Sequence, residues 1–277
     1  MYMRNFVRQY QIVAFLISTC YYCDMKEKLV DCHAHLIFDG VDPNQIVEKM
    51  EDDNLFAIVS VGTSPSDIKK VLDFAKSQKN IFASIGFHPE YADQIEEKDY
   101  VALHALAKDK KVVAIGECGL DYHYRQDNKE VQKAVFVRQI QIAKNLSKPL
   151  MIHLREAEED AIEILREHAN GITIVVHCFS AVSEEVTKAF VRMGAYISFA
   201  GNLTYKKFRR EDALLIPKDR LLVETDSPFL APEPVRGTKN CSANVHYVAS
   251  KLAQVVGEDE ETMKKQLREN ARRVFGI

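Results

Sequence analysis

Residues 29–36 read LVDCHAHL, in which an apolar start is followed by two histidines one residue apart. The apolar start is typical of a buried strand, and successive side chains of a strand point to opposite faces. We therefore expect His33 and His35 to share one face, with Asp31 behind them. A shared face suits a metal ion, but one imidazole could instead be hydrogen-bonded and the other solvated. The rest of the chain has to distinguish these interpretations.

Apolar runs rich in β-branched residues recur along the sequence. They cover residues 28–36, 56–62, 81–89, 112–120, 149–154, 172–180, 195–201 and 221–228. Nearly continuous apolar runs of this length are typical of strands buried on both faces, as in a parallel sheet. Amphipathic stretches separate the runs, so the sequence predicts a (β/α)8 TIM barrel, with a doubly wound sheet as the alternative. Two further helical stretches, near 243–255 and 259–274, predict additional C-terminal helices.

Several of the expected helices have recognisable starts. Proline follows directly after Asp42 and after Ser64, which predicts an N-cap residue with proline in the first helical position. Ser183 precedes two glutamates, as expected for the first turn of a helix. The longest helix is predicted from about 128 to 146, with an apolar stripe that consists of Val131, Val135, Ile142 and Leu146.

The composition is that of an ordinary globular protein, with 47% hydrophobic and 28% charged residues among 277. A net charge of -3 argues against a broadly basic surface that coats nucleic acid, although it leaves room for a local basic patch. Six cysteines are too few for a disulfide scaffold in a chain of this length. No low-complexity segment or long linker divides residues 25–277, which we expect to form a single domain.

Residues 1–24 differ from the rest of the chain. They carry Arg4 and Arg8 and then an apolar run over residues 12–17, which is too short to span a bilayer. The segment could be a weak signal peptide or an upstream reading of the gene, with Met25 as the natural start. We favour Met25, because it would stand directly before the first predicted strand. We therefore expect a cytoplasmic protein with no membrane attachment.

Ionisable side chains gather at the predicted C-terminal ends of six strands, where the active sites of such barrels lie. In chain order they are His33 and His35, His88, Glu117 with Asp121, His153 with Arg155, His177, and Glu224 with Asp226. Burying ionisable groups without partners costs on the order of several kcal/mol, so solvation alone is a poor explanation. Imidazoles and carboxylates that converge in this way are expected to hold a pair of divalent metal ions. The mixed donor set is compatible with Zn²⁺, Mn²⁺ or Mg²⁺.

Three cysteines stand beside proposed ligands: Cys32, Cys118 and Cys178. Neighbouring strand positions face opposite ways, so we expect all three thiols to point toward the helices. Free cysteine is among the most buried residue types, and we assign these three to the core rather than to the metal.

Six motifs occur in order along the chain: HAH after an apolar strand, IGFHPE, AIGECGLDYH, IHLREA, VVHCFS and ETDSPFL. The series resembles the TatD family of metal-dependent deoxyribonucleases, which belongs to the amidohydrolase-type metal barrels. The resemblance extends from about residue 28 to NARRVFG at the C-terminus. AIGECGLD and ETDSP are the more specific of the motifs.

The resemblance implies two divalent metal ions per subunit and a role for each motif residue. The first ion would be held by His33, His35, Glu117 and Asp226. The second ion would be bridged by Glu117 and held also by His153 and His177. The scissile phosphate would be contacted by His88 and Arg155.

One departure from the family lies after the eighth strand. The family often has an Arg-Asn-Glu-Pro-like segment there, whereas this chain has TKNCSAN, in which Asn240 alone clearly matches. The departure puts substrate contacts from this loop in doubt, but not the metal ligands.

Other residues keep two interpretations each. Asp226 is either a ligand only or also the acceptor of a proton from the attacking water. Glu224 is expected to support a ligand rather than to bind metal itself. The run YKKFRR at 205–210 could bind phosphate or be a solvated helix face. Three aromatic residues after the fourth strand could stack a base or pack on their neighbours: Tyr122, His123 and Tyr124.

The resemblance implies hydrolysis of phosphodiester bonds in DNA, by an exonuclease that acts on single-stranded or frayed ends. Water activated by the metal ions near neutral pH would be the nucleophile. Two alternatives stay open. One is hydrolysis of a small-molecule amide, lactone or ester at the same kind of site. The other is a metal-binding barrel with little turnover, against which the complete ligand set argues.

A chain that begins at Met25 is expected to fold and to keep its activity, because residues 1–24 supply neither a predicted strand of the barrel nor a proposed ligand. Soluble expression and hydrolysis by the shortened chain are the measurements that check this. Loss of soluble protein on truncation would contradict it, and secretion of a processed form would favour the signal peptide.

Overall fold

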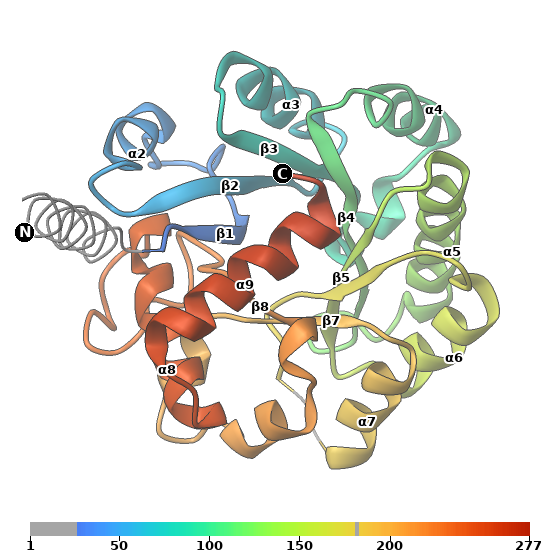
Figure 1. Ribbon diagram of the computed structural model, residues 1–277. Coiled ribbons are helices and arrows are strands. Elements are labelled where there is room, and N and C mark those ends of the chain that lie inside the picture. The colour runs from blue at the N-terminus through green and yellow to red at the C-terminus, as the bar shows by residue number, and fades with distance from the viewer. Residues whose placement is uncertain (1–26, 181–182) are drawn as a thin grey trace, which may run out of the picture.

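The computed structural model describes residues 27–180 and 183–277, so the leader and the expected start at Met25 lie outside the described residues. Eight parallel strands form one sheet in the order β1 to β8 and curl into a barrel (Figure 1). The sheet meets itself where Ala34 of the first strand pairs with Ser227, which follows the last. The strands are β1 (Leu29–Ala34), β2 (Leu55–Gly62), β3 (Ile81–Ile85), β4 (Val112–Asp121), β5 (Leu150–Arg155), β6 (Ile174–Val176), β7 (Tyr196–Phe199) and β8 (Leu221–Val223). The prediction of a (β/α)8 barrel is confirmed.

Helices alternate with the strands and surround them (Figure 1). They are α2 (Pro43–Lys49), α3 (Ile68–Ser77), α4 (Glu97–Leu106), α5 (Lys129–Leu146), α6 (Glu158–His168), α7 (Glu184–Arg192), α8 (Val245–Val256) and α9 (Glu260–Phe275). The connection from β7 to β8 consists of short 3-10 helices: η2 (Gly201–Thr204), η3 (Arg210–Leu215) and η4 (Lys218–Arg220). The two helices after β8 confirm the predicted C-terminal additions. Within the described residues, no helix is both long and apolar enough to cross a membrane.

Two of the predicted N-caps are present. The Asp42 carboxylate accepts the backbone N–H groups of Asn44 and Gln45 at 3.1 and 3.2 Å. The Ser183 hydroxyl accepts the N–H group of Val186 at 3.4 Å. These bonds satisfy donors that the first turn of a helix leaves without an internal partner, which is why such residues mark helix starts.

Two details of the predicted helices are wrong. The helix expected from Ser64 begins at Ile68 instead. The cause is Asp67, whose carboxylate accepts the N–H group of Ser64 at 2.9 Å and holds the preceding residues in a turn. Val131, which was expected on the buried stripe of α5, is 41% exposed. The face of α5 that packs against the barrel is centred on the fully buried Phe136, and Val131 does not lie on this face.

Apolar side chains fill the barrel beneath the predicted site. Met151 and Leu222 belong to one buried cluster, and they stand two residues before His153 and Glu224. Strand positions two apart share a face, so the predicted site residues point inward above this cluster. Phe275 of α9 joins the cluster from the other end, where the last helix lies across the barrel (Figure 1). The predicted site residues therefore lie at the C-terminal end of the strands.

Two glycines of β4 allow the close approach of β4 and β5 around Glu117. Gly116 has a φ of +140° and Gly119 a φ of +138°, in a region that side chains with a Cβ rarely adopt. A Cβ at Gly116 would lie 2.1 Å from the carbonyl oxygen of Met151, and one at Gly119 would lie 2.0 Å from that of His153. The glycines of the AIGECG motif therefore let the backbones of β4 and β5 approach closely at the level of the barrel where the side chains of Glu117 and His153 meet.

Core burial is confirmed for Cys32 and Cys118, but the expected orientation toward the helices is confirmed for Cys118 only. Cys118 packs in the layer between strands and helices, as expected. Cys32 is buried but belongs to the cluster inside the barrel, because the register of β1 against β2 shifts and breaks the simple alternation. Cys178 is partly buried and lines the mouth, since β6 has ended at Val176 and the chain turns with a φ of +46° at Cys178.

Candidate metal centre

Glu117 lies among the imidazoles of five histidines at the mouth of the barrel, and its side chain is 4% exposed. Its Oε2 atom lies 3.4 Å from His33 Nε2 and 3.8 Å from His35 Nε2. Its Oε1 atom lies 2.9 Å from His153 Nδ1 and 2.8 Å from His177 Nε2. The two oxygens of one carboxylate therefore face two separate groups of imidazoles.

Asp226 stands beside the first of these groups. Its Oδ1 atom lies 3.3 Å from His35 Nε2 and 3.7 Å from His33 Nε2. The backbone N–H group of Asp226 donates to the carbonyl oxygen of His33 at 2.9 Å, which ties the segment after β8 to β1. The Nε2 atoms of His33 and His35 are 3.3 Å apart, so the two histidines of the HAH motif do face the same way.

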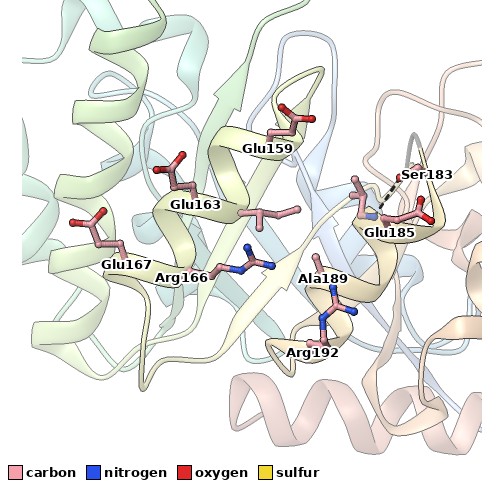
Figure 2. Close-up of a pocket in the computed structure, with 10 residues that line it drawn as sticks. Glu159, Glu163, Arg166, Glu167, Ser183, Glu185, Ala189 and Arg192 are labelled. Atoms are coloured by element: carbon pink, nitrogen blue, oxygen red, sulfur yellow. Dashed lines mark hydrogen bonds between the residues drawn. The ribbon is translucent and has the colours of Figure 1, made fainter.

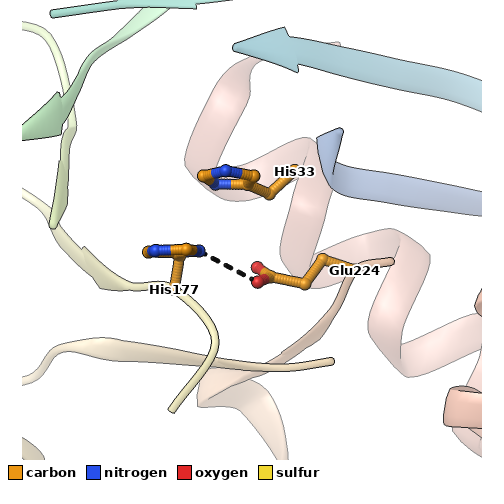
Figure 3. Close-up of side chains that lie close together, drawn as sticks. All are labelled: His33, His177 and Glu224. Carbon is orange, nitrogen blue, oxygen red and sulfur yellow. Dashed lines mark hydrogen bonds and ion pairs between the residues drawn. The ribbon is translucent and has the colours of Figure 1, made fainter. Parts of the chain in front are cut away.

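Glu224 holds the outer nitrogen of His177. Its Oε1 atom lies 3.1 Å from His177 Nδ1 and accepts the N–H group of Cys178 at 2.8 Å (Figure 3). With Nδ1 bound to a carboxylate, His177 presents Nε2 to Glu117. The rings of His33 and His177 are stacked, with centroids 4.0 Å apart (Figure 3). This geometry supports the expectation that Glu224 orients a ligand.

Asp121 has no role in the predicted ligand set, yet its Oδ2 atom lies 3.0 Å from His153 Nε2. A neutral His153 that donates Nε2–H to Asp121 presents Nδ1 to Glu117. Asp121 is held in turn by the N–H group of His123 at 2.9 Å. The signal that could have identified this residue is its even spacing from Glu117 on the same strand, which places both carboxylates on one face.

The charges of the centre depend on one another. Burial alone would raise the pKa of the Glu117 carboxyl, but the imidazoles of His177 and His33 hold its pKa well below the ordinary value. Burial alone would lower the pKa of His177, but the carboxylates of Glu117 and Glu224 hold it well above the ordinary value. Burial alone would also lower the pKa of His153, but hydrogen bonds to the carboxylates of Asp121 and Glu117 raise it above the ordinary value. Without a cation, protonated imidazoles therefore balance the buried carboxylates.

His88 faces the same centre from the loop after β3. Its Nδ1 atom accepts the N–H group of Glu90 at 3.2 Å, which leaves the ring proton on Nε2. His88 Nε2 lies 3.7 Å from Glu117 Oε1. Burial and the neighbouring imidazole of His153 lower the pKa of His88 to about 3, so this ring is neutral near pH 7. His88 thus offers an uncharged N–H donor to the centre.

Arg155 lies at the edge of the mouth. Its guanidinium carbon is 4.9 Å from the centroid of the Tyr124 ring, a cation–π contact. Asp121, which stands opposite Arg155 in the pairing of β4 with β5, pairs with His153 rather than with the guanidinium group. Tyr124 is 73% exposed, whereas Tyr122 is 5% exposed and donates its hydroxyl to a carboxylate of α6 at 2.7 Å. Of these two tyrosines, Tyr124 is accessible to a ligand and Tyr122 is part of the core.

The basic run at 205–210 divides into structural and exposed residues. Arg209 pairs with Asp212 at 3.1 Å, and Arg210 donates to a backbone carbonyl of the same loop at 2.6 Å. The two arginines therefore stabilise the connection between β7 and β8. The two lysines of the run are exposed and accessible to a solute.

Asn240, the one clear match in TKNCSAN, is 4% exposed. Its Nδ2 atom donates to the carbonyl oxygens of Thr225 and Phe229 at 2.9 and 2.7 Å. Its Oδ1 atom accepts from Asn244 Nδ2 at 2.9 Å. Asn240 therefore determines the shape of the loop that carries Asp226.

The centre opens into a cavity of about 670 Å³ at the C-terminal end of the barrel, lined by Glu117 and Asp226 among others. Another depression, of about 760 Å³, lies on the outer surface between α6 and α7 (Figure 2). Charged side chains of both signs border it, including Glu163, Arg166 and Arg192 (Figure 2). Of the described residues that line this outer groove, none belongs to the predicted site. The predicted site residues therefore line the barrel mouth and not this outer groove.

The residues at the mouth fit divalent metal ions. Among the described residues, four sets of donor atoms each lie within 4.8 Å of one another. Two of them share Glu117: His33, His35 and Glu117, and Glu117, His153 and His177. The other two are His33, His177 and Glu224, and His88, Asp121 and His153. Imidazole nitrogen and carboxylate oxygen together suit Zn²⁺, Mn²⁺ or Mg²⁺. The buried Oε2 atom of Glu224 has no hydrogen-bond partner among the described residues. An unpartnered carboxylate oxygen beside stacked imidazoles is stabilised when a cation binds nearby.

Comparisons with known proteins agree with this geometry. The sequence profile of the family described as TatD related DNase matches residues 30–276. A Bacillus subtilis protein named "Uncharacterized metal-dependent hydrolase YabD" is 38% identical over 254 residues, which is 90% of this chain and 99% of that protein. An Erwinia amylovora protein named "3'-5' ssDNA/RNA exonuclease TatD" is 30% identical over 245 residues, which is 85% of this chain and 94% of that protein. The crystal structure of YjjV, a TatD homologue from Escherichia coli, matches with a TM-score of 0.84 at 25% identity, over 91% of this chain and 100% of that chain.

The fold and the comparisons together define the class of the protein as a metal-dependent hydrolase with a TIM-barrel fold. Within that class the chain belongs to the TatD family. The resemblance of its motifs to this family is thereby confirmed.

Metal binding is expected to release protons and to weaken as the pH falls. The pKa values of His35 and His153 are raised and that of His177 lies well above its ordinary value, so the metal-free protein holds protons that a metal ion must displace. The affinity for Zn²⁺ or Mn²⁺ should therefore rise with pH until those raised pKa values are passed. Calorimetric titration in two buffers of different ionisation enthalpy counts the released protons. Binding heats that do not depend on the buffer would contradict the charge assignment.

Proposed function

We propose that this protein is a nuclease that hydrolyses phosphodiester bonds at single-stranded or frayed ends of DNA, acting as an exonuclease. One observation carries the proposal: the two oxygens of Glu117 face separate groups of ligand-type side chains. A pair of divalent ions a few ångströms apart is the arrangement that many phosphodiester-cleaving enzymes use. The exonuclease name of the Erwinia relative supports the same substrate class.

The proposed site holds two ions per subunit. The first would be bound by His33, His35, Glu117 and Asp226. The second would be bound by Glu117, His153 and His177. Bound divalent ions lower the pKa of water and offset negative charge on phosphate oxygens. Asp121 and Glu224 keep His153 and His177 in the orientation that such binding requires.

His88 and Arg155 are placed to hold the scissile phosphate. The Nε2–H group of His88 is a neutral donor directed at the centre, and both side chains line the mouth cavity. The guanidinium group of Arg155 is always charged, cannot bind a cation, and suits bidentate contact with phosphate. Together they would orient the phosphodiester without competing for metal.

Asp226 is our candidate for accepting the proton of the attacking water. Its side chain is 14% exposed and lines the cavity. Burial would raise the pKa of Asp226, but hydrogen bonding to His35 and the charge of His33 lower it, so the carboxylate is ionised near neutral pH. A carboxylate in this position can both bind a metal ion and take a proton within hydrogen-bond reach.

Replacement of Glu117 by glutamine is expected to abolish hydrolysis and leave the fold intact, because an amide has only one oxygen and no charge to share between two ions. The measurement is cleavage of 3′- and 5′-labelled single strands with Mn²⁺ or Mg²⁺, together with metal analysis and circular dichroism. Glu130→Gln, on a carboxylate whose side chain is 87% exposed on α5, is the control and should keep full activity. Retention of most of kcat by Glu117→Gln would show that the bridge assignment is wrong. Turnover of an amide or lactone panel, with no cleavage of DNA, would favour the small-molecule alternative.

Arg155→Met is expected to reduce kcat/KM on a phosphodiester by about 10²-fold, the scale expected when the transition state is deprived of one charged hydrogen-bond donor. Metal content and melting temperature should not change, because Arg155 is not a proposed ligand. Arg166→Met, on the outer groove, is the matched control for loss of an exposed guanidinium. DNA cleavage by Arg155→Met at near wild-type efficiency would remove Arg155 from the site. Loss of metal would show instead that it supports His153.

A further inference from the structure

Two phenylalanines are exposed side by side at the mouth of the barrel. Phe38 lies in the loop after β1 and Phe229 in the loop after β8, and they are 46% and 45% exposed. Their rings meet edge to face, with centroids 5.2 Å apart. A single exposed apolar side chain needs no explanation, but an aromatic pair in contact at the edge of a polar centre suggests a ligand.

The aromatic pair adjoins the proposed metal ligands. The centroid of the Phe229 ring lies 5.9 Å from that of His35, and His35 Nε2 lies 3.3 Å from Asp226 Oδ1. Phe38 and Phe229 line the same cavity as Glu117 and Asp226. A group that packs on these rings therefore also lies beside the centre where hydrolysis is proposed.

Hydrogen bonds fix the backbone that carries Phe229. Its N–H group donates to the carbonyl oxygen of Asp226 at 2.9 Å, and its own carbonyl oxygen accepts from Asn240 Nδ2 at 2.7 Å. Asn240 is buried and also donates to the carbonyl oxygen of Thr225 at 2.9 Å. The exposed ring is thus held at a defined place relative to Asp226.

A second aromatic surface lies across the mouth. Tyr124 follows β4, whereas Phe38 and Phe229 follow β1 and β8, which stand opposite β4 in a barrel of this strand order. Tyr124 is 73% exposed, and the guanidinium group of Arg155 lies over its ring. A ligand that crosses the centre therefore meets an aromatic surface on each side and a cation at one of them. A nucleic-acid strand, in which flat bases are joined by anionic phosphates, matches this arrangement of aromatic and cationic groups.

We propose that Phe38 and Phe229 form a stacking subsite for one unpaired nucleobase, next to the phosphodiester bound at the metal centre. The proposal rests on the proposed nuclease function and specifies its substrate as a single strand. Stacking on aromatic side chains is how proteins bind single strands with little sequence preference, because every base has a π face. In a duplex the base is already paired and stacked, so it would first have to be extruded.

The first test uses the full-length wild-type chain loaded with Mn²⁺ and a set of single-stranded oligonucleotides. Each contains one abasic residue, and the position of that residue moves stepwise away from the cleaved end. We expect kcat/KM to fall by about tenfold when the abasic residue occupies the one position next to the scissile bond, which is the scale of stacking by a single base. Equal rates on all the oligonucleotides, the unmodified strand included, would overturn the subsite and leave the nuclease function standing. Failure to cleave any of them would overturn both proposals.

The second test assigns the effect to the rings. Phe229→Leu should cleave the unmodified strand about tenfold more slowly and the abasic strand at the wild-type rate, whereas Phe229→Tyr should restore the preference for the base. Phe38→Leu should weaken the same preference. Val101→Ala, on a side chain of α4 that is 64% exposed, is the control and should change neither rate. Equal losses on both strands in Phe229→Leu would show a structural effect and overturn the stacking role.

Discussion

The buried carboxylate of Glu117 is the constraint on which the proposed metal centre depends. A charge removed from water is tolerated only where other charges or donors surround it, and here each carboxylate oxygen has its own group of imidazoles. Those imidazoles come from β1 and the residue after it, from the loop after β3, from β5 and from the residue after β6, so these segments must present them at one level of the barrel. Gly116 and Gly119 make this possible, because a Cβ at either position would collide with β5.

A second layer of hydrogen bonds fixes the groups that meet Glu117. Asp121 holds His153 and Glu224 holds His177, each through the ring nitrogen that faces away from the centre. The helix α5 supports this layer from outside the barrel. Its buried Gln132 accepts the N–H group of Asp121 at 2.9 Å, and its buried Gln139 donates to the backbone carbonyl that precedes His88 at 3.0 Å. The packing of α5 therefore fixes the backbone at Asp121 and just before His88. A substitution that loosens this helix should change both the stability of the fold and the geometry of the site.

All eight strands could be predicted from the sequence, because strands buried on both faces read differently from amphipathic helices. Their lengths could not be predicted as well. The run at 221–228 contributes only Leu221–Val223 to the strand β8, because the chain after Val223 turns to bring Glu224 and Asp226 into the mouth. The start of α3 was wrong for a similar reason. A side chain–backbone bond from Asp67 competes with the cap that the local sequence favours at Ser64.

By itself the sequence determined that eight strands alternate with helices and that His33 and His35 lie together at the end of the first strand. The first follows from apolar runs separated by amphipathic stretches and the second from the spacing of the two histidines, both of which are local properties. The tertiary structure alone decided which nitrogen of each imidazole faces Glu117, that Asp121 binds the other nitrogen of His153, and that an aromatic pair borders the mouth. These features depend on contacts between residues far apart in the chain. For example, the buried carboxylate of Asp31 accepts a hydrogen bond from the hydroxyl of Thr225 at 2.7 Å. The spacing of residues within either segment does not predict that contact.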